Sequence, residues 1–523
     1  MSKEAAKVIF LLLCVRISSV FVIKTFFSPD EYWQSLEVAH RITFGYGHLT
    51  WEWTKGIRSY FYPTLFAAIY KVLDLLKIDS RVFLILLPRI FQALIASYAD
   101  YRFYVWCNRK KWSLFIIVTS WFWFYTGSRT FINSFEAALT TIALSFFPWN
   151  ENSENTGFLW ITALLTYIRP TSVLTWAPLC FYHVKKSKYP GWELLLKRYL
   201  FIGLFTGSVL AALDSYIHGS FIITPYEFFK VNVLDGIGSF YGTHPWYWYF
   251  STGLPAILGI GIVPFFLSIF VAIQSWDESK SRQYILFSII LTIFGYSLLP
   301  HKEFRFLLQI LPLCLYCITQ FLSEWSRTKS TIVIWLVAVV ILVSNVIPAG
   351  YLGFVHQQGT LNAMDKLASI ASDYKTENGQ PAKFLFLMPC HSTPYYSHIH
   401  QNVTMRFLTC EPNFKNQENY LDEADKFYEA PMVWIRRHLP VHPIDALPTH
   451  VIVFDTLVPK ISDFLSIYKP LEIFFHADHL VSQRNGRNVM IYERTQVAKK
   501  KIESDIVKET PEVKQEDQIQ DEL

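Results

Sequence analysis

The sequence predicts an all-α polytopic membrane protein with a small C-terminal α/β domain. The 523 residues are 52% hydrophobic and 17% aromatic, with a mean hydropathy of +0.25, which is too apolar for an ordinary soluble protein. Apolar segments long enough to cross roughly 30 Å of hydrocarbon recur as far as residue 352. After residue 360 the pattern changes to short apolar runs between polar stretches, as expected of strands and helices in a small domain.

We expect about eleven membrane helices in residues 1–355. The first apolar segment is long for a signal sequence, carries Arg16 and has no small-x-small motif before Ser28, so we expect it to be retained. Residues 157–182 predict two half-helices broken at Arg169-Pro170-Thr171, because proline interrupts the hydrogen-bond ladder and a deep arginine needs a polar cavity. The other segments lie near residues 8–27, 82–105, 112–126, 131–147, 199–216, 245–272, 284–299, 303–322 and 331–352.

Short basic loops orient these helices. Cations cluster before the first segment and at residues 108–111, 185–188, 280–282 and 327–329, and such loops face the cytosol. The acidic segment after the first helix, the break at Arg169 and the cluster at His301 then share the luminal side. This topology requires that residues 60–78 lie along the luminal interface without crossing. The net charge of +5 is explained by these loops, and no nucleic-acid partner is predicted.

Residues 360–495 predict the luminal α/β domain. The runs at 383–388 and 450–455 have the composition of short buried strands. Cys390 and Cys410 are candidates for a disulfide in an oxidising lumen, and Asn402 begins a glycosylation sequon, a triplet that also occurs by chance.

The charged tail, residues 496–523, is expected to be disordered. Its last residues, Gln520-Asp521-Glu522-Leu523, resemble the luminal endoplasmic-reticulum retention tetrapeptide. A chance ending is the equal alternative, so the tetrapeptide alone does not decide the compartment.

A charged cluster at a predicted membrane edge is the first candidate site. His301, Lys302, Glu303 and Arg305 fall within five residues between two apolar segments. Ionisable groups at a membrane boundary are costly and usually serve an ion, a phosphate or a polar substrate. The three cations could clamp a phosphate, with Arg305 bidentate and Lys302 as a point charge, while Glu303 orients one of them. The alternative is a loop whose charges are solvated or paired with each other.

The adjacent carboxylates Asp30 and Glu31 form the second candidate site. Neighbouring side chains point about 100° apart in a helix and to opposite faces in a strand. One can therefore act as general base on a substrate hydroxyl while the other braces the loop. The alternative is an acidic pair that simply favours a helix N terminus. Fixed carboxylates and fixed cations together predict acid–base chemistry on a phosphate-bearing lipid.

Further residues could support the site or line its cavity. A polar insert lies between two predicted helices, although it could be only a capped loop, and an arginine at membrane depth needs a role or a partner. Aromatic segments suit sugar rings, but Trp and Tyr also gather at membrane interfaces without a ligand. Cys314 and Cys317 lie inside an apolar helix, where no metal site is expected. The supporting candidates are Arg129, Asn133, Glu136, Arg169, Trp51 and His244.

These elements, taken in order, resemble the dolichyl-phosphate-mannose-dependent mannosyltransferases of the endoplasmic reticulum, glycosyltransferase family 22, which have the GT-C fold. The resemblance covers almost the whole chain, and the His-Lys-Glu-x-Arg-Phe element is quite specific. Many relatives carry Glu where this chain has Phe304, and Phe fits the glycosylphosphatidylinositol (GPI) branch. The residues that carry the resemblance are 29–38, 45–53, 129–136, 169–171, 244–254, 301–306 and 389–400.

The resemblance implies a single inverting displacement, because the donor mannose is β-linked and the product is α-linked. Mannose would pass from dolichyl-phosphate-mannose to the second mannose of the GPI precursor, giving the third mannose in α1,2 linkage. Asp30 would take the hydroxyl proton, and His301, Lys302 and Arg305 would bind the phosphate leaving group.

The same resemblance implies an endoplasmic-reticulum membrane enzyme with a luminal site, a lipid-linked donor and a glycolipid acceptor. No cofactor is expected. No metal site is assigned, because the chain offers no compact Asp/Glu/His ligand set, and metal dependence is left open. A sibling of N-glycan precursor assembly is the nearest alternative. A transporter is the alternative from another class, and it would show an internal repeat with paired broken helices.

Overall fold

The computed structural model describes residues 3–149, 155–274, 280–415, 417–439, 446–479 and 482–495. The predictions for the charged tail and its last four residues therefore lie outside the described part. The chain divides into two compact units, which are described separately. The first comprises Met1–Asp365, Thr393–Asn402 and Glu411–Tyr420, and the second comprises Lys366–Ser392, Val403–Cys410 and Leu421–Leu523.

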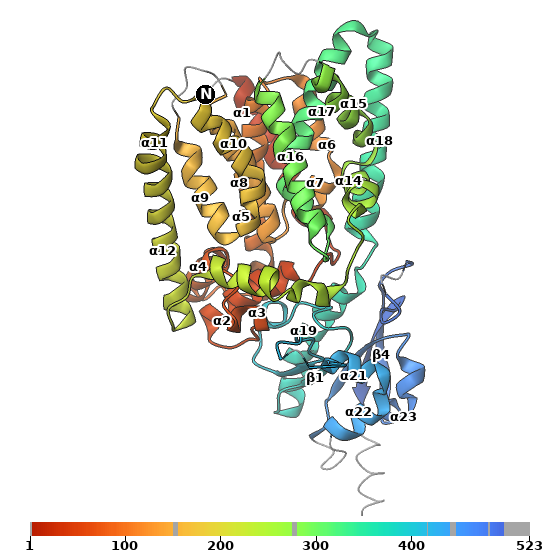
Figure 1. Cartoon of the computed structure of the whole chain (residues 1–523). Coiled ribbons are helices and arrows are strands. Elements are labelled where there is room, and N and C mark those ends of the chain that lie inside the picture. Colours follow the sequence, from red (N-terminus) through yellow and green to blue (C-terminus); the bar gives the residue numbers. More distant parts are fainter. Residues whose placement is uncertain are drawn as a thin grey trace, which may run out of the picture. The chain divides into compact units, whose positions relative to one another are not determined.

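The first unit is helical, with long helices that run side by side (Figure 1). Within the described ranges, five helices are long and apolar enough to cross a membrane: Lys3–Val22 (α1), Arg81–Trp106 (α5), Gly191–His218 (through α12, Phe201–His218), Tyr249–Gln274 (through α15, Ile262–Gln274) and Thr331–Glu377 (from α18, Thr331–Phe354). Several apolar helices are thus present, while the count of eleven stays a prediction.

Helices also occupy the remaining predicted segments. They are Lys111–Thr119 (α6), Trp121–Thr126 (α7), Ile132–Phe146 (α8), Gly157–Ile168 (α9), Val173–Lys186 (α10), Lys280–Leu298 (α16) and Leu311–Trp325 (α17). The short helices Glu37–Phe44 (α2), Trp51–Thr54 (α3) and Phe61–Leu76 (α4) gather at one end of the first unit (Figure 1).

Three predicted segments are less continuous than expected. Segment 112–126 is interrupted at Ser120, between α6 and α7. Segment 245–272 changes helix type near Gly259, whose φ of +52° favours glycine. Segment 303–322 begins with a 3₁₀ turn, Phe304–Gln309 (η9), before α17. Hydropathy reports burial in an apolar medium and does not report such local breaks.

The break at Arg169 is present in the structure. α9 ends at Ile168, and a 3₁₀ turn, Pro170–Ser172 (η2), precedes α10. The Arg169 Nε atom donates over 3.1 Å to Oε2 of buried Glu136 in α8, and the Ser172 hydroxyl donates to the same carboxylate. The deep arginine therefore has a charged partner, as a buried cation requires.

A second buried ion pair joins α1 to α5. Arg16 Nε donates over 2.5 Å to Asp100 Oδ2, and its other nitrogens donate to the carbonyls of Ile117 and Trp123. The interruption at Ser120 leaves the Ile117 carbonyl without its helical donor, because the Trp121 amide donates to Asn345 instead, whereas the Trp123 carbonyl accepts from Arg16 in addition to the Gly127 amide. The arginine in the first apolar segment thus has a structural role.

The second unit contains a five-stranded sheet of order β2-β1-β3-β5-β4. Its strands are Lys383–Leu387 (β1), Thr404–Phe407 (β2), His450–Phe454 (β3), Tyr468–Phe475 (β4) and Asn488–Arg494 (β5). β1 pairs in parallel with β2 and β3, whereas β5 is antiparallel to β3 and β4. Helices such as Glu423–Glu429 (α21) and Pro431–His438 (α22) accompany the sheet. The two expected strands are β1 and β3, so the α/β character is confirmed.

The division into compact units differs in detail from the predicted domains, residues 1–355 and 360–495, which stay a prediction. Thr393–Asn402 and Glu411–Tyr420 belong with the helical unit. The buried Glu37 carboxylate accepts bonds from the Tyr395 amide at 2.8 Å and the Ser397 hydroxyl at 2.5 Å, and Trp33 Nε1 donates to the Thr393 carbonyl. These hydrogen bonds connect residues about 360 positions apart in sequence. Such contacts cannot be predicted from residues that are neighbours in the sequence.

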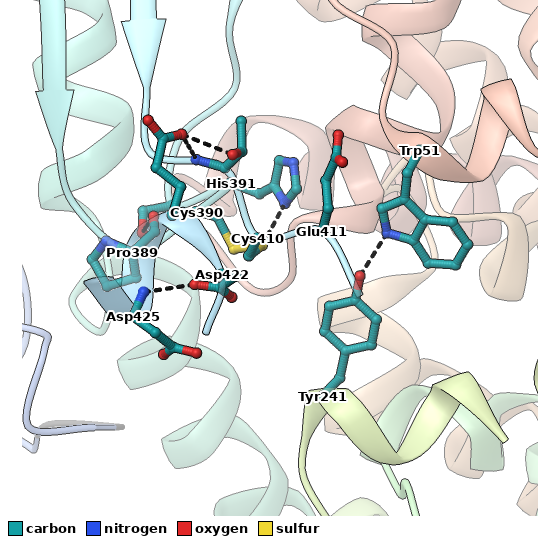
Figure 2. Close-up of a disulfide and its surroundings, with 12 residues drawn as sticks. Trp51, Tyr241, Pro389, Cys390, His391, Cys410, Glu411, Asp422 and Asp425 are labelled. Carbon is teal, nitrogen blue, oxygen red and sulfur yellow. Dashed lines mark hydrogen bonds between the residues drawn. A yellow bond between two sulfur atoms is a disulfide. The ribbon is translucent and has the colours of Figure 1, made fainter. Parts of the chain in front are cut away.

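Cys390 and Cys410 are joined by a disulfide in the second unit, with their Cα atoms 5.9 Å apart (Figure 2). His391 Nδ1 lies 3.8 Å from Cys410 Sγ. The three side chains are close enough to hold a metal ion, but disulfide sulfurs are not the thiolates that bind metals. Asn402 is exposed, and its glycosylation stays a prediction.

Candidate active site

The adjacent carboxylates Asp30 and Glu31 begin the helical segment that leads into α2, and they point to different partners. Glu31 Oε2 lies 2.7 Å from Arg129 Nη1, and only 2% of the Glu31 side chain is exposed. Asp30 instead accepts a hydrogen bond from Arg305, and 19% of its side chain is exposed. The pair therefore separates into one buried group and one group that solvent can reach.

Arg129 is held firmly in place. Its Nε donates to the Tyr125 carbonyl at 3.0 Å, its Nη2 to Thr25 Oγ1 at 3.2 Å, and its guanidinium lies 4.3 Å from the Tyr125 ring centroid. The Thr130 hydroxyl donates to the Glu31 carbonyl. Glu31 and Arg129 thus brace the segment after α1 against the segment before α8. Of the two expected roles, Glu31 has the contacts of the carboxylate that braces the loop, and a catalytic role for it stays a prediction.

Asp30, His301, Glu303 and Arg305 form one connected cluster. Arg305 donates from Nε and Nη2 to the two Glu303 oxygens, at 2.6 and 2.5 Å, and from Nη1 to Asp30. His301 Nε2 lies 2.9 Å from Glu303 Oε1. The cluster joins positions 275 apart in the sequence, and it alternates two cationic side chains with two carboxylates.

His301 is set up to carry a positive charge. Its Nδ1 lies 3.2 Å from the Gly242 carbonyl, so both ring nitrogens face acceptors and each needs a proton. Burial alone would lower the pKa of His301, but the hydrogen bond and charge of Glu303 outweigh it and raise the pKa above its usual value. The cluster therefore offers two cations, His301 and Arg305, to an anion.

Lys302 does not join this cluster. Its side chain is buried, and Nζ donates to the carbonyls of Leu299 and His244. The His244 amide in turn donates to the Pro300 carbonyl at 2.9 Å. The ammonium is thus engaged by backbone acceptors, and its direct binding of phosphate stays a prediction. Lys302 positions the loop around His244 against the His301 loop.

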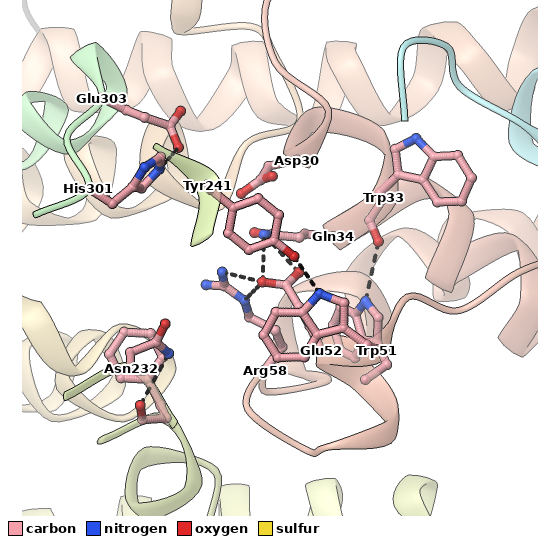
Figure 3. A network of polar contacts seen from close by, with 12 residues as sticks. Asp30, Trp33, Gln34, Trp51, Glu52, Arg58, Asn232, Tyr241, His301 and Glu303 are labelled. Carbon is pink, nitrogen blue, oxygen red and sulfur yellow. Dashed lines mark hydrogen bonds and ion pairs between the residues drawn. The ribbon is translucent and has the colours of Figure 1, made fainter. Parts of the chain in front are cut away.

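A polar network that the sequence reasoning missed lies near Asp30 (Figure 3). Glu52 Oε1 accepts from Arg58 at 2.7 and 3.1 Å, and Glu52 Oε2 accepts from Gln34 Nε2 at 3.0 Å. Trp51 Nε1 donates to the Tyr241 hydroxyl at 2.6 Å. An acid between two tryptophans, Trp51-Glu52-Trp53, was the available signal, because a carboxylate in an aromatic segment needs a partner.

The remaining candidates are dispersed around the cluster. Glu136 and Arg169 form the buried pair described above, and the ring of exposed His244 stacks on Trp248 with centroids 5.0 Å apart. Asn133 is buried, and neither side-chain amide atom has a protein partner within the described ranges. Of the predicted residues, the structure therefore gathers Asp30, His301, Glu303 and Arg305 into one site.

Comparisons with known proteins show the family of the chain. The sequence profile of the Alg9-like mannosyltransferase family matches residues 7–400. The chain belongs to the Alg9-like mannosyltransferase family. GPI mannosyltransferase 3 of Drosophila melanogaster is 53% identical over 484 residues, covering 92% of this chain and 86% of the fly protein. GPI alpha-1,2-mannosyltransferase 3 of Homo sapiens is 41% identical over 496 residues, covering 92% and 86%. The family resemblance drawn from the motifs is confirmed.

The fold of this Alg9-like chain is that of a GT-C membrane glycosyltransferase. The crystal structure of ArnT from Cupriavidus metallidurans bound to undecaprenyl phosphate superposes with a TM-score of 0.55, covering 94% of this chain and 98% of ArnT. The two sequences are only 10% identical, so the likeness concerns the fold alone. The all-α membrane architecture predicted from hydropathy is confirmed at this level.

The cluster in this Alg9-like mannosyltransferase has the parts needed for acid–base chemistry beside an anion. Asp30 uses one oxygen, Oδ2, to meet Arg305, which leaves Oδ1 for a substrate hydroxyl. Arg305 makes three side-chain bonds, fewer than its N–H donors allow. A proton acceptor and a cation with spare donors thus lie next to each other.

Proposed function

We propose that this protein transfers mannose from dolichyl-phosphate-mannose to the second mannose of the GPI anchor precursor and forms the third mannose in α1,2 linkage. The observation that carries the proposal is the contact between Asp30 and Arg305. This contact supports the roles that we propose, Asp30 as base and Arg305 as phosphate-binding cation, in a chain 53% identical to a GPI mannosyltransferase 3. Mannosyltransferase activity in GPI-anchor biosynthesis is supported by the family and by relatives that match over most of the chain.

The reaction we propose is a single in-line displacement. The acceptor hydroxyl gives its proton to Asp30 as its oxygen attacks C1 of the donor mannose. The bond between C1 and the phosphate oxygen breaks, and dolichyl phosphate leaves with one additional negative charge. Arg305 and protonated His301 stabilise that charge, because fixed cations in a partly dry site lower the energy of a developing anion. The configuration at C1 inverts.

Glu303 has a supporting role in this proposal. It bonds both His301 and Arg305, so it fixes the direction of the two cations before the donor arrives. Such preorganisation reduces the rearrangement needed during the reaction. The mechanism needs no cofactor, and the carboxylates Asp30, Glu303 and Glu52 each have a cationic partner.

We place the enzyme in the endoplasmic-reticulum membrane with the site on the luminal side. The support for the luminal side is the charge of the loops. When the predicted membrane helices are counted, the basic loops fall on one side of the membrane, and the segments that contain Asp30 and His301 fall on the other. The partners that follow are a lipid-linked donor and a glycolipid acceptor.

The test is transfer by the purified full-length protein with two acceptors offered side by side. One is a dimannosyl GPI precursor and the other a dolichol-linked oligomannose. Transfer to the first alone supports the proposal. Transfer to the second alone would retain the chemistry but assign the enzyme to N-glycan precursor assembly, and transfer to neither by a folded sample would overturn the proposed reaction.

A further inference from the structure

Five side chains beside Asp30 form a polar and aromatic surface that the mechanism above does not use. We call this surface, made of Gln34, Trp51, Glu52, Arg58 and Tyr241, the acceptor wall. Its members come from the π-helical turn Tyr32–Leu36 (η1) before α2, from α3 with the turn after it, and from the 3₁₀ turn Ile237–Tyr241 (η5). All of them belong to the first unit, and Figure 3 shows them together with Asp30, His301 and Glu303.

The wall has unused hydrogen-bonding capacity within the described part of the chain. Gln34 is 7% exposed, and its buried Oε1 has no hydrogen-bond partner. Glu52 Oε2 accepts only from Gln34 Nε2 at 3.0 Å, whereas Oε1 receives both bonds from Arg58. A buried carbonyl oxygen without a donor is unfavourable, so two ligand hydroxyls, one donating to Gln34 and one to Glu52, would stabilise this arrangement.

Tyr241 contributes the opposite polarity. An indole N–H can only donate, so the Tyr241 oxygen accepts from Trp51 and its own O–H stays available as a donor. Burial, together with the neighbouring Glu52 and Asp30 carboxylates, raises the pKa of Tyr241 and keeps the phenol protonated. The wall thus presents acceptors from Gln34 and Glu52 and a donor from Tyr241, and each hydroxyl of a sugar can both donate and accept.

The position of the wall relative to the base indicates which sugar it meets. Gln34 follows Asp30 by about one helical turn, so the two lie on the same face of their segment. Figure 3 shows Tyr241 between His301 and Glu52, and the Tyr241 ring centroid is 6.4 Å from that of His301, one of the two cations proposed to bind phosphate. The Glu52 carboxylate would repel a phosphate but can bind a neutral polyol. In an in-line displacement the acceptor approaches from the side opposite the leaving phosphate.

We propose that the acceptor wall binds the terminal mannose of the acceptor through ring hydroxyls other than the reacting 2-hydroxyl, namely the 3- and 4-hydroxyls. Glu52, Gln34 and Tyr241 hold those hydroxyls and thereby place the reacting hydroxyl on Asp30. Arg58 is a positioning residue that fixes the Glu52 carboxylate. This inference rests on the proposed function, because it assumes that the acceptor ends in a mannose.

The test uses the full-length enzyme with Glu52→Gln and Tyr241→Phe, which keep side-chain volume nearly unchanged. Each variant should raise the KM for the dimannosyl GPI precursor by about tenfold or more, the size expected for hydrogen bonds to charged or buried groups. The KM for dolichyl-phosphate-mannose should change less than twofold. Matched controls are Tyr247→Phe in the same loop and Glu193→Gln, whose carboxylate pairs with exposed Lys197; both should behave as wild type.

Acceptor analogues provide a readout that a purely structural role would not move. Precursors lacking the 3-hydroxyl or the 4-hydroxyl of the terminal mannose are compared in wild type and Glu52→Gln. For at least one analogue, loss of the hydroxyl should raise the acceptor KM of the wild-type enzyme but have little further effect on the KM of Glu52→Gln. The variant already lacks the hydrogen bond that the missing hydroxyl would have made. Three results would contradict acceptor binding by this surface: an unchanged acceptor KM in the variants, an increase in the donor KM instead, or fully additive effects of the variant and of each missing hydroxyl. If the wild-type enzyme transfers no mannose to the GPI precursor, the proposed function itself is wrong.

Discussion

The neighbouring residues Asp30 and Glu31 should respond in opposite ways to the same conservative change. In Asp30→Asn, Arg305 keeps its two bonds to Glu303, so the cluster should keep its shape. Arg305 keeps Glu303 as a counter-charge, and Asp30 is more exposed than Glu31, so the loss of folding stability should be smaller than in Glu31→Gln. The lost general base, however, should lower kcat by roughly 10²–10⁴-fold, equivalent to about 3–5 kcal/mol of activation free energy.

Glu31→Gln is the matched control. Only 2% of the Glu31 side chain and 1% of the Arg129 side chain are exposed, so the change leaves a buried guanidinium without a counter-charge. Breaking such a pair costs about 3–5 kcal/mol of folding stability. We therefore expect low protein levels and a lowered thermal midpoint, with kcat per folded molecule reduced far less than in Asp30→Asn.

The assay measures initial rates of mannose transfer at saturating donor and acceptor, with thermal unfolding and protein level followed in parallel. The reasoning is refuted if Asp30→Asn, at normal protein level, retains kcat within tenfold of wild type. A stable Glu31→Gln protein without activity would show that the two roles are exchanged.

Three further predictions concern pH and the disulfide. Because the folded pKa of His301 is raised, the charge is complete below the pKa of free histidine and is lost as pH rises through the folded pKa. Transfer should therefore fall at alkaline pH, and His301→Gln should remove that limb of the pH–rate profile; an unchanged limb would contradict the assignment. Burial raises the pKa of Glu37 to about 7 against hydrogen bonds from Ser397 and Tyr395. The folded protein therefore holds this proton where the unfolded chain has lost it, and stability should fall as pH rises from about 4.5 to 7. Glu37→Gln should flatten that part of a melting-temperature series, and an identical slope in both proteins would argue against it. Replacing Cys390 and Cys410 by Ser opens a loop of 20 residues, which should cost about 3 kcal/mol of unfolding free energy; equal denaturant midpoints for reduced and oxidised wild type would contradict this value.

Parts of the fold were predictable because their causes are local. Long apolar stretches, the helix break at Arg169-Pro170-Thr171 and the strands β1 and β3 follow from residues that lie next to each other in sequence. The edge strand β4 was not predicted, because it is partly exposed and lacks a buried apolar run. The grouping of Thr393–Asn402 with the helical unit was not predictable, because its contacts with the helices are distant in sequence.

The sequence by itself determined the membrane class, the family and the residue types available for chemistry, since composition, proline breaks and ordered motifs need no partner to be recognised. Only the tertiary structure decided what each charged side chain does. Asp30 meets Arg305 across 275 positions, Glu31 meets Arg129 across 98, and Trp51 meets Tyr241 across 190. The role of a charge in a dry interior is set by its nearest opposite charge or hydrogen-bond partner. That partner is chosen by the packing of distant helices and cannot be read from sequence neighbours.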